Sequence, residues 1–173
     1  MPIASGYNFS YLEFSDGDEP WGGPAPTGIS GGLYSCDAGK DCVSNSLRLY
    51  NYGFSLPDSV INGIIVNIYC SSIRIGDEMY VKLYDGTTLV GTEKIGIWDE
   101  DQVFGNSTDM WGTSLTYDKI NLTNFGIRLY GIGQSNGTIL TVVNSEIIVD
   151  YDTDPDPTGG GGGSGNIFLF NIF

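Results

Sequence analysis

The sequence contains no histidine, and this absence excludes several kinds of chemistry at once. Ser-His-Asp and Cys-His catalytic sites need an imidazole as the general base, and His-ligated metal sites need it as a ligand. The glycine runs do not follow a strand and open a helix, so they do not predict a phosphate-binding loop. We therefore expect no cofactor and no metal held by histidine.

Basic residues are also scarce, with 7 Lys and Arg against 21 Asp and Glu and a formal net charge of −14. Such a surface repels the phosphates of nucleic acids and of anionic membranes, so neither is an expected partner. No apolar run approaches the roughly 20 residues of a membrane span. The first residues, MPIASGYNFSYLEF, lack the basic start and apolar stretch of a secretion signal, which predicts synthesis in a cytoplasm and a chain that remains soluble.

Cysteine is rare and odd in number, which makes a poor disulfide framework. Cys36 and Cys42 bracket a short polar loop that oxidation could close. Cys70 lies on the apolar face of a predicted strand and is expected to be buried.

Alternating apolar residues are abundant, most clearly in the segment 60–90. Period two is typical of a strand, because successive side chains point to opposite faces. After that run, Asp85-Gly86 predicts a hairpin with a type I′ turn, since the pair tolerates two positive φ angles. One face carries Ile64, Val66, Ile68 and Cys70, then Met79, Val81 and Leu83, while Tyr80, Lys82 and Tyr84 point the other way.

Further strands are predicted at 46–54 and 92–97, with one short strand around Tyr7–Phe14 in the N-terminal arm, and a second hairpin joins 125–132 to 138–151. One helical turn is expected at 117–122, capped by Thr116 or Asp118. The whole pattern predicts an all-β fold, an antiparallel two-sheet β-sandwich of jelly-roll kind. We expect an N-terminal arm and loop (1–43), the β-sandwich domain (44–151), a flexible acidic and Gly-rich linker (152–166) and an apolar peptide (167–173).

The apolar C-terminal peptide, IFLFNIF, follows a glycine run that gives it reach. We expect it to dock on another subunit by adding a strand to a neighbouring sheet edge, although folding back onto its own domain is the alternative. The docking residues would be Ile167, Phe168, Leu169, Phe170, Ile172 and Phe173.

The segment 98–112, predicted to be a long loop, combines acidic and aromatic residues. Trp98, Asp99, Asp101 and Trp111 form a candidate glycan-binding loop. The same loop also offers paired carboxylates for glycoside hydrolysis, which needs two acids roughly 5–10 Å apart. The alternative is a solvated loop whose tryptophans fill the core. The carboxylate candidates are Asp99, Glu100, Asp101 and Asp109.

Two other acidic clusters could bind calcium, which prefers several oxygen ligands, but the EF-hand spacing is absent. Trp21, between Pro20 and Gly22, is expected to cover one end of the core, with a partner contact as the alternative. The acidic clusters are Asp150, Asp152, Asp154 and Asp156, and Asp16, Asp18 and Glu19.

A succession of short motifs also resembles a known module. Gly53-Phe54-Ser55-Leu56-Pro57 precedes Val60-Ile61-Asn62-Gly63-Ile64, and Met110-Trp111-Gly112 precedes the run from Ile120 to Leu129. Over 44–151, this order is similar to a β-sandwich module of structural proteins in tailed bacteriophage virions. The resemblance implies a capsid decoration, head-fibre, tail or baseplate subunit with no catalytic residues, and it implies that Trp111 and Phe125 are core residues.

The first functional hypothesis is therefore a non-enzymatic phage virion structural protein. It would be made in the host cytoplasm, reside in the virion and bind other copies of itself and other virion proteins. The second hypothesis is a carbohydrate-binding or host-attachment module that uses Trp98, Trp111 and the tyrosines of the surface loops to bind a host surface glycan. The third is a glycosidase built on the acidic loop. Arg128 is expected to point away from the core and to pair with an acid.

Overall fold

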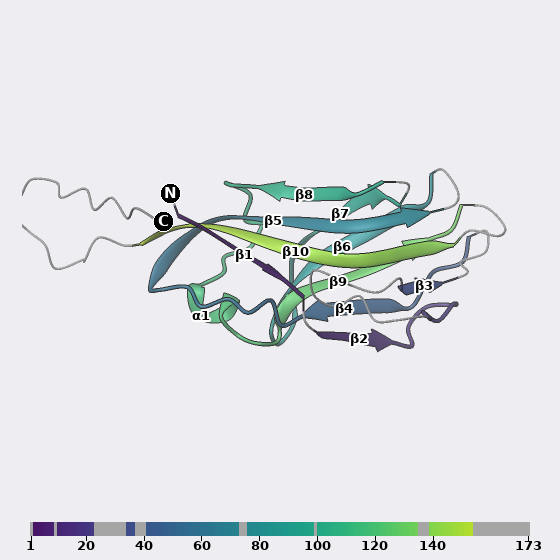
Figure 1. Ribbon diagram of the computed structural model, residues 1–173, viewed down its shortest axis with the longest axis horizontal. Helices are drawn as coiled ribbons and strands as arrows, with labels where there is room; N and C mark the ends of the chain where they lie inside the picture. The colour runs from purple at the N-terminus through teal and green to yellow at the C-terminus, as the bar shows by residue number, and fades with distance from the viewer. Residues whose placement is uncertain are drawn as a thin grey trace, which may run out of the picture.

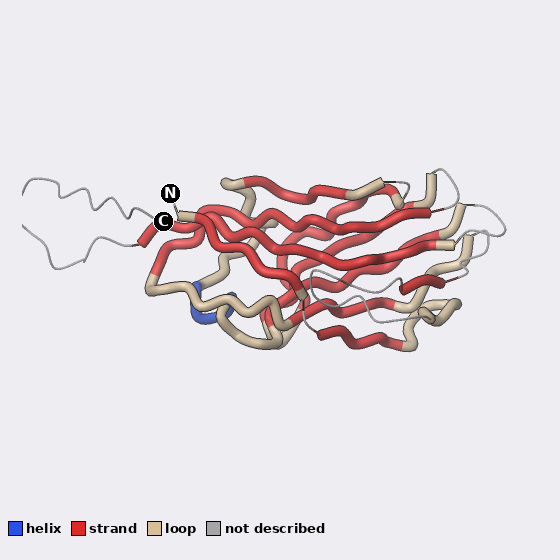
Figure 2. The backbone as a smooth tube through the Cα atoms, in the orientation of Figure 1, coloured by secondary structure: helices blue, strands red, loops and turns tan. Residues whose placement is uncertain are grey.

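The chain forms two antiparallel sheets that pack face to face, as Figures 1 and 2 show. The computed structural model describes residues 2–8, 10–22, 34–36, 41–72, 76–98, 100–134 and 139–153. All strand pairs are antiparallel. The predicted all-β, jelly-roll-like sandwich is confirmed.

The first sheet, called sheet A, has the order β1-β10-β5-β8, and β3 pairs with one end of β10. The second, sheet B, has the order β2-β4-β9-β6-β7. Sheet A consists of β1 (Ile3–Tyr7), β3 (Tyr34–Cys36), β5 (Ser59–Ser72), β8 (Gln102–Asn106) and β10 (Leu140–Thr153). Sheet B consists of β2 (Ser10–Phe14), β4 (Ser46–Tyr50), β6 (Glu78–Asp85), β7 (Leu89–Ile97) and β9 (Phe125–Ile132).

The core lies between the two sheets and follows the alternation of each strand. Leu49 in β4 and Leu129 in β9 are fully buried from one side, and Val66 in β5 and Val149 in β10 are fully buried from the other. Full burial of such a side chain stabilises the fold by about 1.5–3 kcal/mol. Because of the same period, the remaining residues of β4, β6 and β9 point out from sheet B.

Two predicted pairings are wrong. β5 lies in sheet A and β6 in sheet B, so the segment 60–90 crosses between sheets instead of forming one antiparallel unit. β9 and β10 likewise lie in different sheets and form no hairpin. The β6–β7 hairpin does form, but Gly86 is the one residue of its turn (85–88) with a positive φ, +94°. A type I′ turn needs two successive residues of positive φ, so the predicted turn type is also wrong.

The N-terminal segment differs most from expectation. The predicted arm and loop supply β1 and β3 to sheet A, where both pair with β10, and β2 to sheet B, where it pairs with β4. Gly6 lies against the backbone of Tyr52, where a side chain would clash. The sandwich therefore extends beyond the expected boundaries 44–151 at both ends, since β10 also continues to Thr153.

The predicted loop 98–112 contains β8, which pairs with β5. The predicted helical turn is α1 (Tyr117–Ile120), and it contributes Ile120 to the core. Thr116 occupies its N-cap position, but its side chain makes no capping hydrogen bond. Within the described part of the chain, the structure has no helix of the length and apolarity needed to cross a membrane.

Candidate functional site

The outward face of sheet B brings charged and aromatic side chains into ordered rows. Arg48 on β4 is in register with Arg128 on β9, and Arg128 is in register with Lys82 on β6. We call these three residues the cation row. One pair further along the same face, Tyr130 on β9 stands opposite Tyr80 on β6.

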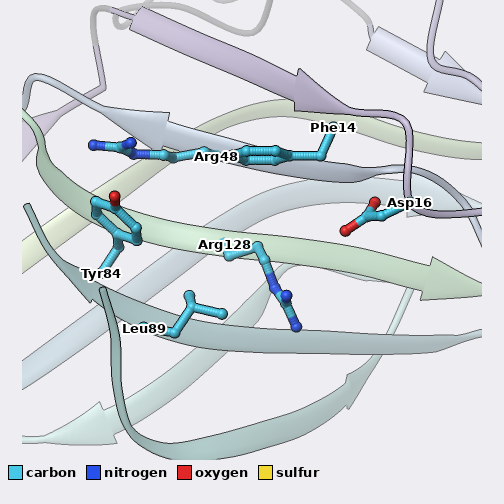
Figure 3. A pocket seen from close by; sticks show the side chains of 6 residues that line it. All are labelled: Phe14, Asp16, Arg48, Tyr84, Leu89 and Arg128. Atoms are coloured by element: carbon cyan, nitrogen blue, oxygen red, sulfur yellow. The ribbon is translucent and has the colours of Figure 1, made fainter. Parts of the chain in front are cut away.

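A shallow groove of about 240 Å³ crosses this face. Its lining comes from all five strands of sheet B and from the loop after β2, so the whole sheet shapes it. In Figure 3, Tyr84 and Leu89 lie on one side of the groove, Phe14 and Asp16 lie on the other, and the two arginines lie between them. The lining residues are Phe14, Asp16, Arg48, Tyr84, Leu89 and Arg128.

A second hollow of about 200 Å³ shares Asp16 and Arg128 with the groove, so the two form one continuous depression. It extends the depression toward Tyr130 and toward the backbone around Ser44. Its lining residues are Asp16, Val43, Ser44, Ser46, Arg128 and Tyr130.

Arg48 is held by aromatic rings rather than by a carboxylate. Its guanidinium carbon lies 3.6 Å from the ring centre of Tyr84 and 5.1 Å from that of Tyr50. One terminal nitrogen donates a hydrogen bond to the carbonyl oxygen of Asn124 at 2.8 Å. Gly126 stands between Tyr50 and Tyr84 in the row next to Arg48, and a Cβ at this position would clash with the backbone of Leu49.

Arg128 extends away from Tyr84, as Figure 3 shows. Its guanidinium carbon lies 5.5 Å from the ring centre of Tyr130, and a terminal nitrogen lies 3.5 Å from a carboxylate oxygen of Glu93. The prediction that Arg128 pairs with an acid outside the core is confirmed. Both arginines keep a buried Nε that has no hydrogen-bond partner among the described residues.

Tyr80 and Tyr130 form a flat aromatic pair beside the arginines. Their ring centres lie 4.8 Å apart with an interplanar angle of 5°. Tyr80 donates to Glu78 at 2.5 Å, and this hydrogen bond, with burial, raises the pKa of Tyr80 to about 12. Burial, followed by the charge of Glu93, raises the pKa of Tyr130. Both phenols are therefore neutral at physiological pH, and each keeps its proton for hydrogen bonding.

The charges on this face are only partly balanced. Three ion pairs occur among the described residues, and they involve Lys94, Lys119 and Arg128. Arg48 and Lys82, the other two described cations, have no carboxylate within ion-pair distance in the part of the chain that the structure describes.

This arrangement has the chemical features of a site for a polar, flat-faced ligand. Aromatic rings offer surface to apolar C–H groups, and guanidinium groups offer several N–H donors in a fixed plane. An open groove suits a chain that continues beyond the site at both ends. The carboxylate of Asp16 is already engaged, since its Oδ1 accepts a hydrogen bond from the backbone N–H of Ser46 at 2.7 Å.

The predicted glycan loop is not this site. Trp98 and Trp111 are 0% and 1% exposed, so neither ring can stack on a sugar, and that prediction is wrong. Their indole N–H groups donate to the carbonyl oxygens of Glu78 and Ile64, which anchors both rings in the core. The alternative interpretation of these rings, that they fill the core, is the one that the structure confirms.

The other residues of that loop have structural contacts. Asp101 accepts a hydrogen bond from the backbone N–H of Cys70 at 2.9 Å, and Asp99 lies outside the described residues. Asp109 pairs with Lys94 at 2.6 Å, and this hydrogen bond, the largest cause, lowers the pKa of Asp109. A general acid for glycoside hydrolysis needs a raised pKa, so Asp109 does not suit that role.

The acidic clusters also serve the fold. Asp18 accepts a hydrogen bond from the backbone N–H of Val43, and Asn62 donates to both Asp150 and Asp152. No group of three or more metal-binding side chains occurs among the described residues. Asp154 and Asp156 lie outside them.

Trp21 is buried and packs against Trp98, with ring centres 5.8 Å apart, which confirms that it covers one end of the core. The predicted docking peptide, 167–173, lies outside the described residues. Its role stays a prediction.

No family model matches this chain, and no curated protein matches it significantly. Solved structures do resemble it. A glycoside hydrolase domain of Endo-D from Streptococcus pneumoniae has 12% identity and a TM-score of 0.46, over 81% of this chain and 21% of its own. The C-terminal family 6 carbohydrate-binding module of LamC from Zobellia galactanivorans has 16% identity and a TM-score of 0.41, over 86% and 100%.

A family 11 carbohydrate-binding module from Clostridium thermocellum has 12% identity and a TM-score of 0.40, over 87% of this chain and 97% of its own. These similarities concern the arrangement of the strands. They do not identify a site in this chain.

Proposed function

We propose that this chain is a non-catalytic carbohydrate-binding protein whose site is the groove on the outer face of sheet B. The observation that carries this proposal is the lining of the groove. Stacked tyrosine and guanidinium groups form its walls, in a depression to which every strand of sheet B contributes.

A sugar ring has an apolar C–H face and a rim of hydroxyl groups, and the groove offers a partner for each. The rings of Tyr84 and Phe14 in the groove, and the ring of Tyr130 in the adjoining hollow, provide apolar surface. Arg48 and Arg128 provide terminal N–H donors, and the contacts described above engage one terminal nitrogen of each. Such a site positions aromatic and polar groups on rigid strands, which lowers the entropy lost on binding.

The proposal agrees with the names of the two carbohydrate-binding modules above, but it depends on the groove of this chain. Binding without hydrolysis fits the state of the carboxylates. Asp16, in the groove, already accepts a backbone hydrogen bond, and Asp109 is paired with Lys94.

The virion role implied by the sequence resemblance stays a separate prediction. A glycan-binding face is compatible with a host-attachment role for such a protein. Its expected assembly contacts involve residues 167–173, which the structure does not describe.

Affinity gel electrophoresis of the full chain in gels that contain single polysaccharides tests the proposal. The panel would include laminarin, mixed-linkage β-glucan, xylan, galactan and polygalacturonate. We expect retardation by at least one polysaccharide, and loss of that retardation in Tyr130→Ala. Tyr7→Ala is the matched control, since Tyr7 belongs to a stacked tyrosine pair in sheet A. Absence of retardation by every polysaccharide in the panel, or equal retardation of the two variants, would contradict it.

A further inference from the structure

The cation row places three like charges at directly paired positions on neighbouring strands. Arg48, Arg128 and Lys82 are consecutive in register across β4, β9 and β6. Like charges directly opposite each other on one sheet face are destabilising. Alternating charges at these positions would make the fold more stable. The cation row therefore lowers the stability of the fold, and a bound anionic ligand can offset this loss.

The composition of the chain makes the row more unusual. The sequence has 21 acidic residues and 7 basic ones, yet three of the basic residues meet on one face of one sheet. Acidic partners are therefore abundant, and the other described lysines use them: Lys94 pairs with Asp109 and Lys119 pairs with Asp85.

Two members of the row have no such partner among the described residues. Arg48 is bound by the ring of Tyr84 and by the carbonyl of Asn124, and neither contact neutralises its charge. Lys82 has no ion pair in the described part of the chain. Arg128 is paired with Glu93, but at 3.5 Å and with both side chains close to one-third exposed. Exposed pairs of this kind contribute little.

We propose that the outer face of sheet B selects a glycan that carries an anionic group, a carboxylate or a sulfate ester, and that two cations bind this group: Arg48, which lines the groove, and Lys82, which lies beside the groove opposite Arg128. This inference rests on the proposed function and narrows its ligand class. A planar guanidinium can donate two parallel hydrogen bonds to a carboxylate or sulfate, and the lysine adds a mobile second charge. Hydrogen bonds to charged groups are stronger than those to neutral hydroxyls.

The acidic surroundings limit the site to a few anionic groups. Asp16 lines the groove, and Glu93 lies beside Arg128. Double-stranded DNA carries one charge per about 1.7 Å of its axis, so it would bring many phosphates against these carboxylates and against the net charge of −14. An acidic polysaccharide with about one charge per sugar ring brings far fewer charges to the site. At physiological salt, repulsion from charges more than about 8 Å away is largely screened. The cation row is therefore the main electrostatic influence on a sugar acid bound in the groove.

Affinity gel electrophoresis of the full chain with matched pairs of polysaccharides tests this inference. Polygalacturonate is compared with its methyl ester, which keeps the backbone but removes the carboxylate charge. A sulfated galactan is compared with the same galactan after desulfation. The first pair reports on carboxylates and the second on sulfate esters. Laminarin, mixed-linkage β-glucan and xylan serve as neutral ligands without a charged counterpart.

For at least one pair, we expect the chain to bind the acidic polysaccharide with about tenfold higher affinity than its neutral counterpart, as measured by its retardation. Arg48→Gln and Lys82→Gln should each abolish most of this difference. Lys119→Gln, which removes the same charge from α1, should not. Circular dichroism spectra that match the parent confirm that each variant is folded.

Retardation by neutral polysaccharides only, or equal retardation by both members of each pair, would overturn the inference and leave the proposed function intact. An equal effect of Lys82→Gln and Lys119→Gln would also overturn it, because net charge would then explain the preference. Absence of retardation by every polysaccharide would contradict both.

Discussion

The guanidinium carbon of Arg48 lies 3.6 Å from the ring centre of Tyr84, although the two residues belong to strands separated by β9. This contact crosses the middle of sheet B over Gly126, and it joins a cation to an aromatic face at the groove. A cation held over a ring at this distance is attracted by the electrons of the ring, by about 0.5–2 kcal/mol. The Arg48–Tyr84 contact thereby forms a flat wall of the groove with N–H donors along its edge.

Tyr84→Ala should weaken polysaccharide binding by about tenfold, because it removes a wall of the groove and frees the guanidinium of Arg48. Retardation in affinity gels measures this change. Tyr69→Ala is the matched control, since Tyr69 is a half-buried tyrosine on the outer face of sheet A. Comparable losses in the two variants would show that sheet B has no special role.

Lys82→Gln should raise the free energy of unfolding by about 0.2–1 kcal/mol, because it removes one like-charge neighbour of Arg128. Urea denaturation at low ionic strength measures the gain, which should shrink as salt screens the charges. A variant less stable than the parent would show that Lys82 serves the fold.

Trp111→Phe should lower the free energy of unfolding by about 1–3 kcal/mol, since it leaves the buried carbonyl oxygen of Ile64 without the indole N–H that now binds it. Polysaccharide affinity should not change, because the ring of Trp111 is buried and lines neither the groove nor the adjoining hollow. Denaturation and affinity electrophoresis on the same preparation test both statements. Loss of polysaccharide affinity without loss of stability would instead support the predicted glycan-binding role of Trp111.

Asp85 should make the fold sensitive to acid. Partial burial alone would raise the pKa of Asp85, but hydrogen bonds from Thr88, Thr87 and Lys119 together hold it well below its ordinary value of 3.8. A carboxyl whose folded pKa is depressed stabilises the fold above its unfolded pKa, and this contribution is lost as the pH falls toward the folded value.

Asp85→Asn should therefore cost about 1–2 kcal/mol of unfolding free energy near neutral pH, where the charged hydrogen bonds are complete. The difference from the parent should narrow as the pH falls below about 4. Urea denaturation across this range measures both quantities. A difference that stays constant with pH would mean that the charge of Asp85 contributes nothing.

The sequence predicted the fold class because alternation marks each strand, as the inward series from Ile64 to Ile68 does. It did not predict the partners of the strands. The segment 125–151 looks like a hairpin, but β9 and β10 join different sheets, and only packing of the whole core decides this. The predicted short strand around Tyr7–Phe14 includes β2, but β1 was not predicted, because it contains Ala4 and Gly6 and shows no strong alternation.

The site could be predicted only in part for the same reason. Alternation alone places Tyr80, Lys82 and Tyr84 on the outward face of β6. That they join Arg48 and Arg128 depends on the register of β4, β9 and β6, which a single sequence does not specify. Trp98 and Trp111 are large aromatics among acidic residues, a pattern that predicts glycan binding, but their burial follows from the tertiary packing.

Chemical-shift mapping tests the central claim most directly. Amide spectra of the ¹⁵N-labelled full chain would be recorded during titration with oligosaccharides of whichever polysaccharide retards it most. The account predicts shifts concentrated at Arg48, Tyr84, Arg128 and Tyr130, on the outer face of sheet B. Shifts concentrated on sheet A, or around Trp98 and Trp111, would contradict it.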